Sequence, residues 1–199
     1  MNNVTVERFQ PSDTLAAAAV LSHAFLTQPN AIAVWGRQDE DARRGIETVF
    51  RIAKLERPIS TVLVARRDGQ IAGALNMTEW PRCQLSPLEK LRLLPLMLRL
   101  PWGVMSRSFQ LQSAWGKHDP QQRHWHLGPL GVLPQLQRLG IGSRMLEKCC
   151  EIVDQKKDAA YLETDRPENV PFYERFGFAV TAEEQILGVR NWFMWRSPH

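Results

Sequence analysis

The chain alternates between short apolar runs and longer amphipathic stretches, the pattern of a protein that mixes strands with helices. Valines alternate with polar residues over residues 4–9, which predicts a first strand. Residues 14–27 are rich in alanine, follow Ser12-Asp13 and stop before Pro29, so they predict a helix for which Ser12-Asp13 offers an N-cap. Apolar residues recur at helical spacing over 40–54, which predicts a second helix.

Two further pairs of segments extend this pattern. The apolar runs 61–65 and 71–77 flank Asp68-Gly69, a dipeptide that favours the tight turn of a β-hairpin. Residues 130–133 form another apolar run, which predicts a strand, and residues 145–153 have apolar positions at helical spacing. The second pair therefore predicts a strand, a connecting loop and a helix in succession.

Residues 81–117 hold more helical sequence than a connection between two strands needs. Ser86 and Glu89 form a capping box around Pro87, which predicts the start of a helix. Pro95 and Pro101 interrupt the helix that follows, so it should be kinked or split. We interpret the segment as an inserted helical lid. The interruptions exclude a membrane-spanning helix, although binding at a membrane interface stays open as an alternative.

The composition narrows the class of protein. A chain of 199 residues that is 44% hydrophobic and 23% charged fits one globular domain over residues 1–199. The formal net charge is only +4 with scattered Lys and Arg, so no nucleic-acid or membrane partner is predicted. Cys83, Cys149 and Cys150 lack the spacing of a disulfide framework or a zinc site, so no metal is predicted.

The same features give expectations about location and assembly. The first residues lack the basic and apolar regions of a signal peptide, and three cysteines are consistent with a reducing compartment, so we expect a cytoplasmic protein. The sequence leaves the choice between a monomer and a homodimer open.

A glycine-bearing loop over residues 137–143, Gln-Arg-Leu-Gly-Ile-Gly-Ser, joins the predicted strand 130–133 to the helix behind it. Backbone N–H groups in the first turn of a helix have no intrahelical partner and carry the positive end of the helix dipole. Glycine lets an anion approach them closely, so this loop predicts a phosphate or pyrophosphate site. The spacing fits neither a dinucleotide fingerprint nor a P-loop, because Met145 replaces the third glycine and no Lys follows Gly142.

The pattern Gln-x-x-Gly-x-Gly over 137–142 resembles the acetyl-coenzyme A loop of the GNAT acetyltransferases. The strand 161–164 and the run Phe-Tyr-Glu-Arg-Phe-Gly-Phe over 172–178 follow it in the family's order. His118-Asp119-Pro120, Trp125-His126-Leu127 and the tail 190–194 also resemble the puromycin N-acetyltransferase branch of that family. The resemblance covers about residues 118–196. It implies an α/β fold with a mixed, mostly antiparallel sheet, splayed central strands and helices on both faces.

The resemblance also implies an acyltransferase that moves acetyl from acetyl-coenzyme A to a primary amine in a ternary complex. The glycine loop would bind pyrophosphate, the strand before it would bind the pantetheine arm, and the helix after residue 168 would cover the cofactor. The implied cofactor-binding residues are Leu130, Gly131, Val132, Gln137, Arg138, Leu139, Gly140, Ile141, Gly142, Ser143, Asn169 and Phe172. Gly128-Pro129 and Gly131 are residues that a bulge in that strand tolerates.

Tyr173 occupies the family's position for the general acid that protonates the departing thiolate. Glu163, at the end of a predicted central strand, is our candidate general base, and Arg166 would otherwise be its ion-pair partner. His124 and His126 lie on one face of the strand before Leu127 and are alternative bases.

The acceptor is less determined by the sequence. Trp102, Trp115, Trp125 and His126 are candidate residues of a pocket for a small-molecule amine, although the tryptophans would equally fit a hydrophobic core. Because a fold does not fix a substrate, three alternatives stay open. The acceptor could be a protein N-terminus or a lysine, and the donor could carry an acyl group longer than acetyl. The chain could also be a catalytically silent module that only binds acyl-coenzyme A.

Overall fold

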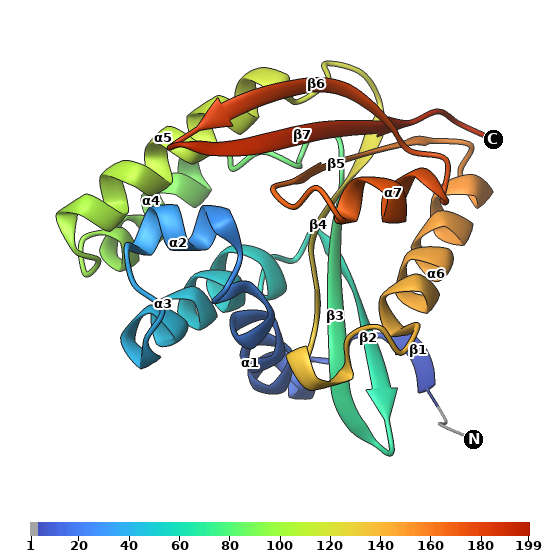
Figure 1. Ribbon diagram of the computed structural model, residues 1–199, viewed down its shortest axis with the longest axis horizontal. Helices are drawn as coiled ribbons and strands as arrows, with labels where there is room; N and C mark the ends of the chain where they lie inside the picture. Colours follow the sequence, from blue (N-terminus) through green and yellow to red (C-terminus); the bar gives the residue numbers. More distant parts are fainter. Residues whose placement is uncertain (1–3) are drawn as a thin grey trace.

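A computed structural model describes residues 4–199 (Figure 1). Within them, seven strands form one sheet in the order β1-β2-β3-β4-β5-β7-β6. Only β4 and β5 pair in parallel, and every other neighbouring pair is antiparallel, which confirms the predicted mixed sheet. The strands are β1 (Val4–Arg8), β2 (Ser60–Arg67), β3 (Gln70–Glu79), β4 (His124–Val132), β5 (Ala159–Thr164), β6 (Ala179–Ile186) and β7 (Val189–Arg196).

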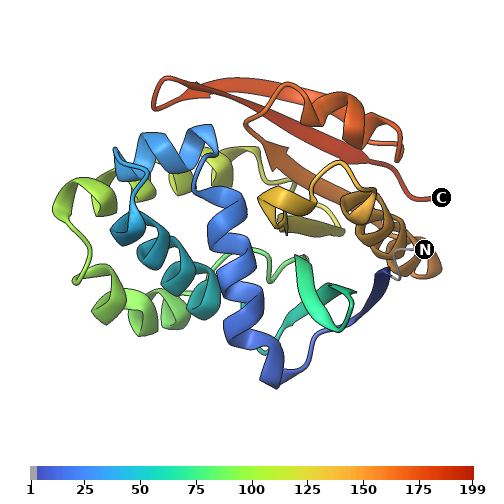
Figure 2. The ribbon, with the colours of Figure 1, turned by 60° about the horizontal axis from the view of Figure 1, so that its bottom comes forward.

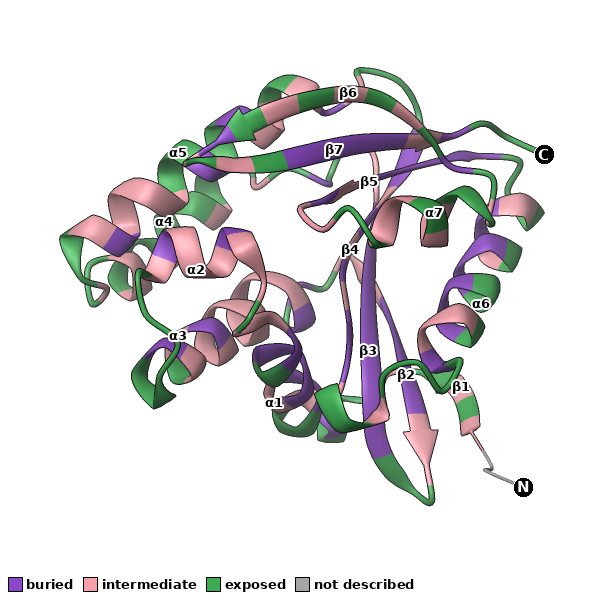
Figure 3. Cartoon of the chain, in the orientation of Figure 1, coloured by how far each residue is buried: buried purple, intermediate pink, exposed green. Residues whose placement is uncertain are grey.

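Helices cover both faces of this sheet. The α-helices are α1 (Thr14–Phe25), α2 (Pro29–Trp35), α3 (Glu40–Phe50), α4 (Pro87–Met97), α5 (Trp102–His118), α6 (Ile141–Gln155) and α7 (Asn169–Glu174). Figures 1 and 2 show α1 to α5 gathered on one side of the sheet and α6 with α7 on the other. The central strand β3 is buried along nearly its whole length because α1 packs on one face and α6 on the other (Figure 3).

The predicted helices form, with two differences near the start of the chain. Helix α1 ends at Phe25, and Pro29 does more than stop it, since Pro29 is the first residue of the unpredicted helix α2. Proline suits that position because its missing N–H would have no partner there. Asp13 is the N-cap residue of α1, within the predicted pair Ser12-Asp13, but its carboxylate makes no cap hydrogen bond there and instead accepts from the Gln10 N–H and pairs with Arg66.

The hairpin and the inserted helices match the sequence pattern. Asp68 and Gly69 both have positive φ angles, 52° and 79°, as the predicted tight turn requires. The Ser86 hydroxyl accepts the Glu89 N–H at 3.3 Å and the Glu89 carboxylate accepts the Ser86 N–H at 2.8 Å, which is the predicted capping box. Pro95 lies inside α4, which ends at Met97. The next helix, α5, begins at Trp102 directly after Pro101, so the segment is split into two helices.

The central strands separate at one point in the sheet. β4 and β5 pair only over three positions, ending with His126 opposite Tyr161. The pairing of β3 with β4 shifts between Leu75 and Met77, so Asn76 faces a bulge at Gly128 and Pro129, as the resemblance to the family implied. Beyond His126 the edge of β4 therefore faces a gap instead of a neighbouring strand, and the loop to α6 lies at the end of this gap.

Candidate functional site

The loop between β4 and α6 has the geometry of an anion site. Gly140 is the N-cap of α6 with a φ angle of +80°, and no side chain caps the helix. A Cβ at Gly140 would meet nothing within 4 Å, so the left-handed backbone, and not a lack of space, explains the glycine. The Gln137 amide donates to the Val132 carbonyl at 3.1 Å and ties the loop to the end of β4. The first N–H groups of α6 are thus left for an external anion.

Helix α7 lies beside this loop. A Cβ at Gly142 would lie 3.8 Å from the Phe172 ring, so α7 comes close to the first turn of α6. The Asn169 amide donates to the Thr164 hydroxyl at 3.1 Å, which fixes α7 to the end of β5. Asn169 is the first residue of α7 and does not cap it. Its side chain therefore positions the helix that carries Phe172 and Tyr173.

Tyr173 packs against aromatic neighbours near this gap. Its ring centre lies 5.1 Å from that of Phe172 and 5.9 Å from that of Phe178, both with tilted planes. Burial, and then the negative charge of Asp165, raise the pKa of Tyr173 above its ordinary value. The phenol therefore stays protonated throughout the neutral and moderately alkaline range.

Gly131 has a second role that the sequence did not show. A Cβ there would lie 2.9 Å from Leu21 Cδ2 and 3.0 Å from the Ala24 Cβ. Helix α1 packs against this part of β4 so closely that only a residue without a side chain fits. The glycine therefore brings the α1 layer against the strand that borders the gap.

On the side of α2 and α5, Glu163 and His126 form a pair. His126 Nε2 lies 2.9 Å from Glu163 Oε2, with both side chains largely buried. The alternative partner Arg166 does not contact Glu163: its guanidinium donates to Gln28 and to the Thr27 carbonyl. Glu163 Oε1 is buried without a hydrogen-bond partner. At the end of β5, Glu163 therefore has one carboxylate oxygen that is bonded to His126 and one that has no hydrogen-bond partner.

Lys54 joins this region and was not identified from the sequence. It lies in the wide helical turn 51–55 that follows α3. Burial lowers the pKa of Lys54, and the negative charge of Glu163 opposes that shift. A single lysine in an amphipathic pattern carries no signal of this kind, because only the packing of the turn 51–55 against α1 and β2 brings it near Glu163.

The four candidate acceptor residues lie in different environments. The Trp115 indole donates to Asn191 Oδ1 at 3.1 Å, and Asn191 is linked in turn to Asn30 on α2. Trp102 is 77% exposed at the start of α5. Trp125 is only 4% exposed and donates to Asp158, in the core cluster on the α6 side, whereas His126 faces Glu163. Trp125 is therefore a core residue on the opposite face of β4 from His126.

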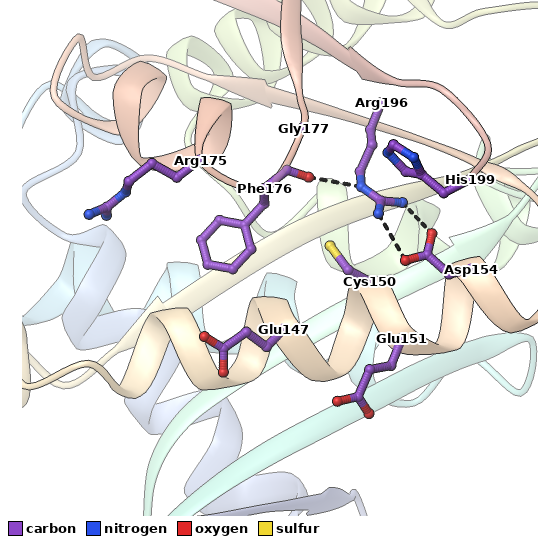
Figure 4. A pocket seen from close by; sticks show the side chains of 9 residues that line it. All are labelled: Glu147, Cys150, Glu151, Asp154, Arg175, Phe176, Gly177, Arg196 and His199. Carbon is purple, nitrogen blue, oxygen red and sulfur yellow. Dashed lines mark hydrogen bonds and ion pairs between the residues drawn. The ribbon is translucent and has the colours of Figure 1, made fainter.

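A hollow of about 440 Å³ lies elsewhere, on the outer side of α6. Figure 4 shows it between α6, the end of α7 and the C-terminal residues, with the Arg196 guanidinium bound to both carboxylate oxygens of Asp154. It contains none of the predicted site residues. Its ion pair anchors the last strand to α6, which is a structural role.

Among the described residues, no helix is long and apolar enough to cross a membrane.

Three solved structures resemble the whole chain in fold. A Corynebacterium glutamicum protein described as histone acetyltransferase HPA2 and related acetyltransferase superposes with a TM-score of 0.71 at 18% identity, covering 100% of this chain and 98% of that one. A Brucella melitensis GNAT family acetyltransferase in complex with acetyl-CoA gives 0.54 at 18% identity, covering 99% and 89%. The Drosophila melanogaster polyamine N-acetyltransferase gives 0.65 at 14% identity, covering 97% and 98%.

The match at the level of sequence is more specific than these likenesses in fold. The profile of the Acetyltransferase (GNAT) family matches residues 23–178. This range includes the glycine loop, the separated strands β4 and β5, and α7 with Tyr173. Since the match covers well over half of the chain, the protein belongs to the GNAT family of acetyltransferases.

Proposed function

We propose that this acetyltransferase transfers acetyl from acetyl-coenzyme A to the primary amine of a small molecule, by direct attack in a ternary complex. The observation that carries the proposal is the uncapped N-terminus of α6 at the end of the gap between β4 and β5. One end of this gap can hold a pyrophosphate, and its walls can hold an extended arm that leads toward Glu163 and Tyr173.

The residues present fit coenzyme A. The backbone N–H groups that follow Gly140 are available to phosphate oxygens, and the left-handed glycine leaves the approach open. Along the gap, β4 residues 130–132 pair with β3 on one side only, so their other edge can bond the amides of pantetheine as an added strand would. Phe172 lies close enough to Gly142 to cover the arm from the α7 side.

The reaction requires two proton transfers. The amine nitrogen forms a bond to the thioester carbon, and the carbon–sulfur bond then breaks. In our proposal Glu163 Oε1 accepts the proton that the amine loses, since it is the free oxygen of a carboxylate held by His126. Tyr173 donates its proton to the departing thiolate. Its raised pKa keeps that proton available but makes the phenol a weak acid, so the transfer must accompany cleavage of the bond.

The acceptor side is formed by α2, α5 and β7, where Trp115, Asn191 and Asn30 are linked by hydrogen bonds. We propose a small apolar or aromatic amine for this side, as the resemblance to the puromycin N-acetyltransferase branch implies. The polyamine acetyltransferase of Drosophila melanogaster shows that a chain of this fold can act on small amines. A protein acceptor is the competing class, in view of the histone acetyltransferase description of the Corynebacterium glutamicum protein.

The test is release of free thiol from acetyl-coenzyme A across a panel of aromatic amines, polyamines, aminoacyl nucleosides and N-terminal or lysine peptides. We expect turnover with at least one small amine at a kcat/KM far above that of any peptide. Turnover confined to peptides would replace the small-molecule acceptor with a protein. Tight binding of acetyl-coenzyme A without turnover on any acceptor would favour a module that only binds the cofactor.

A further inference from the structure

A second cluster of reactive side chains lies beside the proposed acceptor site and takes no part in the proposed chemistry except through His126. Cys83, Asp119, His124 and His126 each turn one ligand atom toward a common point, and these four atoms lie within 4.8 Å of one another. The residues come from three separate places: the connection after β3, the end of α5, and β4. No spacing rule in the sequence joins them, which explains why no metal was predicted.

Three of these ligand atoms are buried without a hydrogen-bond partner: Asp119 Oδ1, His124 Nε2 and His126 Nδ1. The side chains of Asp119 and His124 are 2% and 0% exposed. Buried polar atoms are nearly always hydrogen-bonded, because leaving one without a partner costs about 1–3 kcal/mol. Three such atoms facing one another therefore indicate a missing common partner, and a cation is a partner that all three can share.

Two of the distances between ligand atoms already fit a tetrahedral ion. Zinc bonds of about 2.0–2.3 Å place neighbouring ligand atoms about 3.3–3.6 Å apart. Asp119 Oδ1 lies 3.3 Å from His124 Nε2 and 3.6 Å from His126 Nδ1. Cys83 Sγ lies 3.4 Å from the other Asp119 oxygen. Small side-chain rotations would bring all four atoms onto one ion.

The surrounding contacts prepare the ligands for a metal. The other nitrogen of His124, Nδ1, lies 2.7 Å from the Gln122 carbonyl and must donate to it, so Nε2 carries the free lone pair. His126 Nε2 lies 2.9 Å from Glu163 Oε2 and likewise leaves Nδ1 free. The second oxygen of Asp119 accepts from the Gln84 amide at 2.9 Å. Such outer contacts fix the tautomer and orientation of metal ligands.

The charges also balance. Two of the four ligands, the Cys83 thiolate and the Asp119 carboxylate, are anionic and together carry two negative charges. Zinc supplies two positive charges, which match them. Two imidazoles, one thiolate and one carboxylate in a tetrahedral set favour Zn²⁺ over Mg²⁺ or Ca²⁺, which take oxygen ligands.

We propose that Cys83, Asp119, His124 and His126 form a structural zinc site. Four protein ligands leave no open position for water or substrate, so the ion would hold structure and would not catalyse. Cys83 and Asp119 stand at the two ends of the inserted helices, whereas His124 and His126 belong to β4 just before it leaves β5. The ion would thus fasten both ends of the insertion to the central strand and, through His126, fix Glu163.

The first test measures metal directly in the full-length protein, expressed with zinc and dialysed against metal-free buffer. We expect about one equivalent of zinc per chain, and a fall in melting temperature when a strong chelator removes it. After exchange with Co²⁺ alone, the spectrum should contain a thiolate-to-cobalt charge-transfer band and intense tetrahedral visible bands. A wild-type protein that holds no zinc and gives no cobalt bands would overturn the site, and loss of zinc without a change in melting temperature would overturn its structural role.

Variants locate the metal. Cys83→Ser should abolish the charge-transfer band. Cys150 is a buried cysteine of α6 outside the cluster, and Cys150→Ser should keep both the band and the zinc. Gln84→Ala and Gln121→Ala form a matched surface pair, since Gln84 bonds the Asp119 carboxylate and Gln121 only its backbone carbonyl. Gln84→Ala should weaken zinc affinity by about 10–100-fold and Gln121→Ala should not. An unchanged band in Cys83→Ser would contradict the proposal.

Discussion

At the scale of single residues, the proposed acid is the sharpest point to test. Tyr173→Phe keeps the ring that packs against Phe172 and Phe178 and removes only the proton donor. We expect kcat to fall by about 10²–10⁴-fold, with little change in the affinity for acetyl-coenzyme A. Because the pKa of Tyr173 is raised, the wild-type rate should show no alkaline decline due to the phenol below about pH 10.

The chain supplies its own control for this change. Tyr161 is the only other tyrosine, and its buried hydroxyl has no hydrogen-bond partner, so Tyr161→Phe should fold and turn over within a few-fold of wild type. Wild-type turnover in Tyr173→Phe, measured where chemistry limits the rate, would return Tyr173 to a packing role and leave water as the proton donor.

The proposed base, Glu163, can be tested against another glutamate that pairs with a histidine. Glu163→Gln keeps an oxygen that can accept from His126 but removes the basic group, so kcat should fall by about 10²–10⁴-fold. Glu184 also pairs with a histidine, His118, at 2.7 Å on the outer strand β6, and Glu184→Gln should leave kcat unchanged. If steady-state kinetics give the same kcat for both variants, the amine loses its proton to water instead.

At the scale of elements, one part of helix α5 borders the proposed acceptor side and another part is exposed. Trp115 on α5 donates to Asn191 of β7, whereas Trp102 at the start of the same helix is exposed. Trp115→Ala should therefore raise the KM for the acceptor by about tenfold or more and change that for acetyl-coenzyme A little. Trp102→Ala is the matched control and should change neither KM. Equal rises in both constants for Trp115→Ala, in a variant with native stability, would exclude an acceptor role for α5.

At the scale of the whole molecule, acetyl-coenzyme A should stabilise the folded state, because the proposed site joins β4, α6 and α7 and exists only in the folded chain. A ligand at about 100 times its dissociation constant adds about 2.7 kcal/mol, which corresponds to a rise of several degrees in melting temperature. Gly140→Glu should abolish this shift in a thermal melt, since it places a negative side chain where we propose that the pyrophosphate binds.

Gly188, in the turn between β6 and β7, has the same φ angle of +80° and the same open surroundings as Gly140. Gly188→Glu should therefore strain the backbone equally but keep the ligand-induced shift. A full shift in Gly140→Glu would mean that the cofactor binds elsewhere.

The sequence by itself determined the features that depend on neighbours along the chain. The turn at Asp68, the capping box at Ser86 and the glycine-led start of α6 were readable because a few adjacent residues set their backbone angles and hydrogen bonds. The glycine loop 137–142 and the run 172–178 were enough to indicate the family. The bulge at Gly128 and the mixed sheet were then expected from that resemblance.

The tertiary structure alone decided what depends on which elements face each other. The approach of α1 to Gly131, the pairing of Glu163 with His126 instead of Arg166, and the burial of Trp125 follow from packing across the sheet. The cluster of Cys83 and Asp119 with the two histidines of β4 joins segments with no common spacing. A sequence pattern records periodicity and local chemistry, but contact between distant side chains is set by how helices and strands pack, so these features became visible only in the folded chain.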